Sequence, residues 1–259
     1  NAVDAGVATG FALAVLEPYI YGIGGEVPIL IHLADEKKVV CLSGQGPAPR
    51  NATIEWFRRE GIDAIPGDGL LAAAVPDAVS TWICALSRFG TMRLAQVLDP
   101  VIEIAKRGFP MYDRLRSALE VSSEQFLETW PSSAKTYLPG GRVPDVGEIY
   151  IQTDLGRMFS RLAEAEHRER RRGRREALQA ARDMFYKGDI AERIVQDAQA
   201  REMPMTMRDF RDHTVTWVDP VSTNYRGYDV WELPPNGQGI AALQILNILE
   251  NFDIGALEP

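Results

Sequence analysis

The chain has 259 residues, of which 46% are hydrophobic and 25% are charged, a composition ordinary for a globular domain. Asp and Glu outnumber Lys and Arg by 36 to 28, and the net charge of −8 disfavours non-specific binding to nucleic acid or anionic lipid. The longest strongly apolar stretch, residues 7–16, is too short to span a bilayer. Cys41, Cys84 and three scattered histidines form neither a disulfide framework nor a zinc pattern. We therefore predict two buried thiols, no metal site and no cofactor.

The first residues resemble the start of a helix more than the start of a protein. Asn1 is a good N-cap, Asp4 follows in the first turn, and the first residue is not Met. The last residues stop shortly after another predicted helix. We therefore expect a piece of a longer protein. A targeting signal could lie upstream, so the sequence leaves both a cytoplasmic and a periplasmic location open.

The first 44 residues predict a buried helix followed by a hairpin. Residues 2–16 are small and apolar on nearly every side, which is typical of a helix buried all round. Two apolar, β-rich runs, 27–33 and 39–44, flank the polar turn 35–38 and predict a β-hairpin. Because both runs are apolar on both faces, we expect a sheet covered on both sides.

The middle of the chain is mainly helical by its hydrophobic period. We predict a short helix at 54–60, a helical stretch over 76–128 broken near Gly90, Pro100 and residues 108–110, and a loop-rich segment at 129–150. Further helices are predicted at 153–166, 176–182, 189–200 and 206–211.

The end of the chain predicts a strand pair within 214–233, a loop at 234–239 and an apolar helix at 240–250. With the early hairpin, this pattern indicates one α+β domain over 1–259. Its strands, near 27–44 and 214–233, would meet in one sheet, and a helical lobe would cover about 54–211.

Two glycine-rich loops each allow two interpretations. Residues 22–25 precede a strand and so lack the order of a dinucleotide-binding loop; a tight turn is the plainer interpretation. The loop 234–239 lies between a strand and a helix, where its amide groups could hold an anion or carboxylate. The alternative is that Asn236 caps the helix and the glycines only make the turn.

Residues 168–175 form a run of mainly arginine. This run could bind RNA or an acidic partner, but the acidic balance of the chain favours a solvated surface. No Ser lies in a G-x-S-x-G motif, and neither Cys has a basic neighbour that would activate it. Residue chemistry alone therefore indicates no catalytic centre in this chain.

The order of several segments resembles the large subunit of γ-glutamyltranspeptidases. The opening NAVDAGVATGFALAVLEPYIYGIGG resembles the family's GNAVDAAVA, apolar helix, EP and SGIGGGG. LSGQGPAPRNAT resembles LDGRETAPAAAT, and AVPDAVSTWICALSRFG resembles AVPG…RFG. ARDMFYKGDIAERIV and ELPPNGQGIAALQILNILENFDI resemble FY.G.IA..IV and PPPSSGG…LQ.LNILE.YD. These matches run in order along nearly the whole chain.

The resemblance implies part of an αββα Ntn-hydrolase sandwich with a large helical lobe. Members are made as one precursor that cleaves itself, and the new N-terminal Thr of the small subunit is the nucleophile. This chain would be a large-subunit portion with no catalytic residue of its own. Its partners would be the small subunit of the same precursor and a small-molecule amide, with a heterotetramer as a plausible assembly. The alternative is a non-catalytic relative that binds a small molecule or serves as a scaffold.

The same resemblance places site residues. Gln45 and Gly46 would bind substrate, and four residues would shape the cleft: Gly24, Gly25, Asn236 and Gly237. Gln45 replaces the family's Arg, which pairs with a substrate α-carboxylate, and an amide cannot replace that bidentate pair. Arg50 lies five residues on and would need a rearranged loop to substitute. Glu26 adds a negative charge. These departures suit the subgroup that resembles cephalosporin acylases and small-molecule amidohydrolases more than true γ-glutamyl enzymes.

Overall fold

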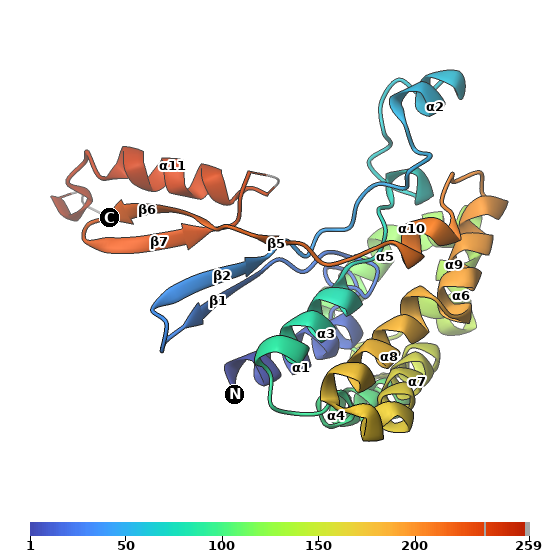
Figure 1. Cartoon of the computed structure of the whole chain (residues 1–259). Helices are drawn as coiled ribbons and strands as arrows, with labels where there is room; N and C mark the ends of the chain where they lie inside the picture. The colour runs from blue at the N-terminus through green and yellow to red at the C-terminus, as the bar shows by residue number, and fades with distance from the viewer. Residues whose placement is uncertain (236, 257–259) are drawn as a thin grey trace.

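A computed structural model of the chain describes residues 1–235 and 237–256. Most of its helices gather into a lobe, while most of its strands and its last helix lie beside that lobe (Figure 1). The helices are α1 (Ala2–Leu16), α2 (Ile54–Arg59), α3 (Ala78–Phe89), α4 (Leu94–Arg107), α5 (Asp113–Glu128), α6 (Pro131–Tyr137), α7 (Thr153–Glu169), α8 (Arg174–Tyr186), α9 (Asp189–Ala200), α10 (Met207–Arg211) and α11 (Gly239–Leu249). The strands are β1 (Ile29–Leu33), β2 (Lys38–Leu42), β3 (Phe109–Pro110), β4 (Ile149–Tyr150), β5 (Trp217–Val218), β6 (Val221–Tyr225) and β7 (Tyr228–Glu232).

Helix α1 lies against α3 and α4 at the centre of the lobe. Phe11 contacts Trp82 with the ring planes tilted and the centroids 4.4 Å apart, and it meets Phe159 of α7 edge-on at 5.4 Å. The expectation of a helix buried all round is wrong, because Ala5 and Gly6 are exposed on the opposite face. The small side chains of α1 therefore allow close packing on one side without requiring cover on the other.

In the helical middle of the chain, helices end at glycines more consistently than at prolines. Gly90 ends α3, and Gly108 ends α4 with a φ of +82°, as predicted. The break predicted at Pro100 is wrong, because Pro100 lies inside α4 on its exposed side, where water can bond the carbonyl left without an amide partner. The loop predicted over 129–150 contains α6, which Pro131 starts at its first position.

The sheet that joins the two ends of the chain is small. Strands β1 and β2 form the predicted antiparallel hairpin, and β2 also pairs with β5, with Leu42 opposite Trp217. This pairing confirms that strands distant in sequence meet. Strands β6 and β7 form a separate two-stranded sheet, with α11 packed on it, so the expected single sheet is wrong in that part. Strand β1 has no fully buried residue, and within this chain it is not covered on both sides.

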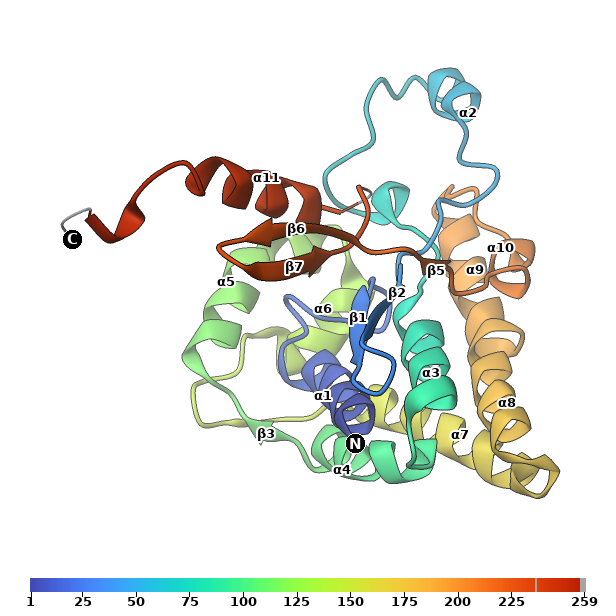
Figure 2. The same ribbon diagram turned by 60° about the vertical axis from the view of Figure 1, so that its left-hand side comes forward.

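The arrangement is α+β, as predicted. Figure 2 shows that β6, β7 and α11 stand to one side of the lobe, and that the segment carrying α2 projects away from the rest. Among the described helices, none has the length and apolar character needed to cross a membrane. Nor do the described residues contain a cluster of three or more side chains suited to a metal ion.

Candidate functional site

Three loops converge beside the N-terminus of α3: residues 24–27, 44–47 and 75–78, here called the three-loop cluster. The Val27 amide donates to the Gly44 carbonyl at 2.7 Å, which joins the first loop to the second. The Val75 amide donates to the Pro47 carbonyl at 3.0 Å, which joins the second to the third. The Gly25 carbonyl accepts from the Asp77 amide at 3.2 Å and closes the set. Backbone hydrogen bonds thus hold the three loops as one unit.

Two glycines make this close approach possible. Gly44 has a φ of +60°, and a Cβ there would lie 1.9 Å from the Val27 carbonyl oxygen. A Cβ on Gly46 would lie 1.6 Å from the Val75 carbonyl oxygen. Both contacts are with backbone atoms, which cannot move aside as a flexible side chain can. The glycines of the GQG segment therefore set the spacing of the cluster.

Four of the predicted site residues lie in this cluster. Gln45 is half-buried between Gly44 and Gly46, while Gly24 and Gly25 are exposed on the neighbouring loop. Gly237 lies instead in the loop after β7, where its amide donates to the Pro234 carbonyl at 3.2 Å. The hydrogen bonds that join the three loops do not include it. Asn236 lies outside the described residues.

Arg50 does not take the place of the missing family Arg in this conformation. Its amide donates to Asp209 Oδ1 at 2.9 Å, and its guanidinium pairs with Asp212 Oδ2 at 3.2 Å. Asp209 in turn caps α10 by accepting from Thr206. Arg50 is therefore held against α10, and the rearranged loop that it would need to substitute at position 45 is not seen in this structure.

A buried polar network lies behind the third loop. Asp77 Oδ1 lies 2.7 Å from His213 Nε2, and the Tyr186 hydroxyl donates to the Pro76 carbonyl at 2.8 Å. Burial is the main cause that raises the pKa of Tyr186 well above its ordinary value, and the nearby Asp77 carboxylate adds to it. The Tyr186 hydroxyl therefore keeps its proton. Sequence reasoning missed this network. One usable signal was Asp77, a charged residue in the apolar run AAAVPDAV where the resembling motif has Gly.

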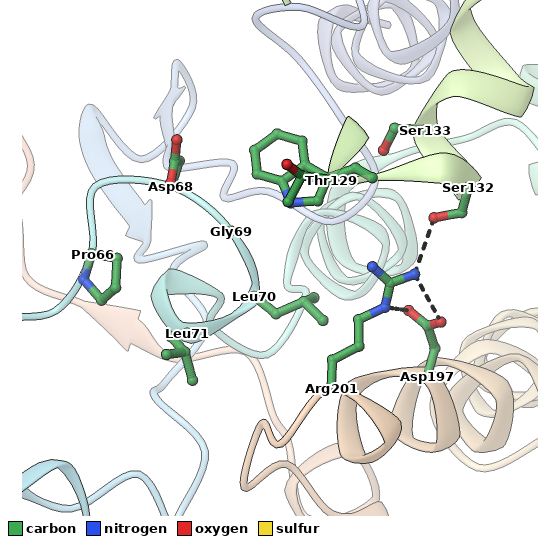
Figure 3. A pocket seen from close by; sticks show the side chains of 11 residues that line it. Pro66, Asp68, Gly69, Leu70, Leu71, Thr129, Ser132, Ser133, Asp197 and Arg201 are labelled. Atoms are coloured by element: carbon green, nitrogen blue, oxygen red, sulfur yellow. Dashed lines mark hydrogen bonds and ion pairs between the residues drawn. The ribbon is translucent and has the colours of Figure 1, made fainter. Parts of the chain in front are cut away.

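Two hollows open on the surface of the lobe, and the larger one reaches the cluster. The larger, about 1110 Å³, is lined by Gly24 and Pro76 and has buried Met203 and Met205 among its walls. The smaller, about 520 Å³, lies under the loop 66–71, and Figure 3 shows Arg201 at its edge, paired with Asp197 and Ser132. Neither hollow pairs a nucleophile with a base within hydrogen-bonding reach among the contacts shown there. Both hollows offer space and polar contacts to a ligand.

The cysteines carry no activated thiol, and the arginine run contains both exposed and structurally engaged side chains. Burial raises the pKa of the Cys41 and Cys84 thiols, so neither is an activated nucleophile. Cys41 is buried as predicted, whereas Cys84 is only half-buried. Arg171 is exposed, in line with a solvated run, while Arg174 donates to the Leu86 and Met92 carbonyls and joins α8 to α3.

Comparison with known proteins shows which family this chain belongs to. The family model for gamma-glutamyltranspeptidase matches residues 1–259. The chain belongs to the γ-glutamyltranspeptidase family. Among curated relatives, it is 35% identical over 260 residues to the glutathione hydrolase-like YwrD proenzyme of Bacillus subtilis, covering 100% of this chain and 46% of that protein. The chain therefore spans about half the length of such relatives.

Solved structures of the family carry the same fold. The γ-glutamyltranspeptidase of Helicobacter pylori is 32% identical, with a TM-score of 0.86, over 100% of this chain and 70% of that one. A cephalosporin acylase from Bacillus halodurans is 31% identical, with a TM-score of 0.87, over 98% and 45%. The predicted family and its Ntn-hydrolase fold are confirmed, and both kinds of relative named by the resemblance are present.

Proposed function

We propose that this chain is the large-subunit part of a self-processing amidohydrolase or acylase of the γ-glutamyltranspeptidase family. The observation that carries this proposal is the coverage: the whole chain matches about half of relatives named proenzymes. A catalytic Thr would then lie in the other half, which agrees with the lack of a nucleophile and base pair in the hollows described above. The chain would supply one wall of the cleft and the helical lobe.

In the proposed reaction, the Thr hydroxyl attacks the amide carbonyl while its own α-amine accepts the proton. The tetrahedral intermediate collapses, the proton passes to the leaving amine, and an acyl-Thr ester remains. Water, or an amine acceptor, then attacks this ester and regenerates the Thr. The role proposed for Gln45 and Gly46 is to bind the acyl group, with Gly24, Gly25, Asn236 and Gly237 shaping the cleft.

The proposed partner, a small subunit cut from the same precursor, has a suitable surface on α11. Ile245 and Ile248 are 55% and 60% exposed, on a helix that is apolar apart from Gln244, Asn247 and its first glycine. Isolated apolar residues on a surface are ordinary, but an apolar helix exposed along its length suggests an interface. We propose that the small subunit covers this face and that the assembled protein forms a heterotetramer.

The substrate preference can be tested at Gln45. A neutral amide cannot form the bidentate charge-assisted pair that a guanidinium makes with a carboxylate. We expect the full-length protein to hydrolyse γ-glutamyl-p-nitroanilide and glutathione poorly, and Gln45→Arg to raise kcat/KM on both by about tenfold or more, which is about 1.4 kcal/mol. Gln45→Met, which is similar in size but uncharged, is the matched control and should give no rise.

Strong γ-glutamyl activity in the unmodified protein would contradict the proposed preference. No rise with Gln45→Arg would show that this side chain does not face the substrate carboxylate. If no amide or anilide is turned over and the precursor stays uncleaved, the alternative of a non-catalytic small-molecule-binding or scaffold relative takes its place.

A further inference from the structure

Asp77 and His213 form a buried pair that helix formation does not explain. Each side chain is 2% exposed, and their Oδ1 and Nε2 atoms lie 2.7 Å apart. The His213 ring packs against the Tyr186 ring at a tilt, with the centroids 5.3 Å apart. The backbone carbonyl of His213 accepts from Arg182, which also donates to Ser80 Oγ at 2.8 Å. Burying such polar groups is costly unless they are hydrogen-bonded, so the pair is held in a defined geometry.

The Asp77 side chain is not used as a helix cap. Asp77 is the N-cap of α3, where a carboxylate usually accepts from an amide of the first turn, but it makes no such bond. Its place is taken by Tyr186, whose hydroxyl accepts from the Ser80 amide at 3.2 Å and donates to the Pro76 carbonyl. Because Tyr186 satisfies the first turn of α3, the Asp77 carboxylate is directed to His213.

The Asp77–His213 pair is connected to the three-loop cluster through the backbone of Asp77 and its neighbours. The Asp77 amide and the Ala78 amide both donate to the Gly25 carbonyl, at 3.2 and 3.1 Å. Two residues before Asp77, the Val75 amide donates to the Pro47 carbonyl at 3.0 Å. The Val75 carbonyl oxygen lies so close to Gly46 that a Cβ there would be 1.6 Å from it. A shift of Asp77 therefore moves the two loops that carry the proposed substrate-binding residues.

We propose that Asp77 and His213 are positioning residues for substrate binding: their buried contact sets where the loops 24–27 and 44–47 stand. This inference rests on the proposed function, because it assigns a purpose to the position of those loops. The resembling motif has Gly at this position, so a carboxylate link of this kind is a departure of the present chain from that motif. Misplacing a binding element by about 1 Å can cost about 100-fold in rate.

The test compares variants in the full-length protein, at a temperature where all are folded. Asp77→Ala and His213→Leu should raise KM about 10- to 100-fold for a p-nitroanilide on which the unmodified protein is active, with glutaryl-p-nitroanilide as the first probe. The change in kcat should stay within a few-fold, because the loops bind ground state and transition state alike. Asp77→Asn keeps an acceptor for His213 and should recover part of the loss.

Asp4→Asn is the matched control. Asp4 is also a buried carboxylate, but its contacts are with Thr91 and Met92, away from the cluster. It should lower the melting temperature and leave KM unchanged. If Asp77→Ala and Asp4→Asn affect KM equally, or if Asp77→Ala and His213→Leu leave it unchanged, the positioning role is overturned.

Hydrogen exchange separates failure of this inference from failure of the proposed function. In Asp77→Ala, peptides covering residues 24–27 and 44–47 should exchange faster, whereas in Asp4→Asn they should exchange as in the unmodified protein. If the protein hydrolyses no amide but this exchange pattern holds, the proposed function fails while the mechanical link stands. If exchange in both loops is unchanged in Asp77→Ala, and likewise in His213→Leu, the link itself is absent.

Discussion

The helical lobe and the β6–β7–α11 unit differ in how completely this chain buries their apolar side chains. Phe11, Phe159 and Leu86 of the lobe are fully buried among neighbouring helices. By composition, helix α11 is as apolar as α1 and more apolar than α3 and α7, yet Leu243 is its one buried residue. Apolar sequence therefore does not say what will cover a helix. The lobe holds its own core, whereas the apolar face of α11 is left open within this chain, where we propose that the small subunit covers it.

The largest expected effect lies in the lobe. Phe159→Ala removes a ring that meets Phe11 edge-on at 5.4 Å in a fully buried position. We expect the free energy of unfolding to fall by about 3–5 kcal/mol, because the cavity adds to the lost transfer free energy. Denaturant unfolding of the full-length protein measures this. A loss below about 1 kcal/mol would mean that the lobe core is far looser than its packing indicates.

The second prediction concerns the apolar face of α11. Ile248→Asp should destabilise the full-length protein by about 2–4 kcal/mol if a partner surface buries that side chain. Val121→Asp, on α5 of the lobe, is the matched control: Val121 is 88% exposed, and its change should cost about 0.5 kcal/mol or less. Melting curves of both variants decide the matter. Equal, small effects would contradict the proposed cover over α11.

The third prediction tests the three-loop cluster, which lies between the two regions. Gly46→Ala places a Cβ against the Val75 carbonyl and should cost about 1–3 kcal/mol and lower activity. Gly24→Ala meets no atom within 4 Å and should be nearly neutral in stability. Thermal melts and kinetics of the pair measure the difference. If both variants behave alike, the loops are not packed as closely as described.

The smallest expected effect is a pH dependence at Asp4. Burial raises its pKa, but hydrogen bonds from the Met92 amide and from the Thr91 hydroxyl and amide outweigh this and hold it well below the ordinary 3.8. Because the folded pKa is the lower one, the Asp4 contribution is fully present above about pH 5 and is lost as the pH falls below 4.

Asp4→Asn should therefore reduce stability by about 1–3 kcal/mol at pH 7, and the difference from the unmodified protein should shrink at pH 3. Urea unfolding at both pH values tests the sign. A difference that grows towards low pH would contradict the assignment of these hydrogen bonds to the charged carboxylate.

Local sequence signals predicted where helices and strands lie better than which of them pack or pair together. Gly108 ended α4 as expected because its φ of +82° favours glycine, and Gly90 ended α3 where a Cβ would lie 2.7 Å from the Leu86 carbonyl oxygen. Pro100 was tolerated because it lies on an exposed helix face. The separate β6–β7 sheet could not be foreseen, because strand pairing depends on contacts distant in sequence. The same holds for Asp77 and His213, which are 136 positions apart. The cluster residues were placed by the family resemblance rather than by composition.

The most direct test of the account is the chain composition of the full-length product. Intact-mass analysis under denaturing conditions, with N-terminal sequencing of every chain, shows whether the precursor cleaves itself. The account predicts two chains, with this sequence in the larger one and Thr as the first residue of the smaller. A single uncleaved chain would contradict the proposed amidohydrolase.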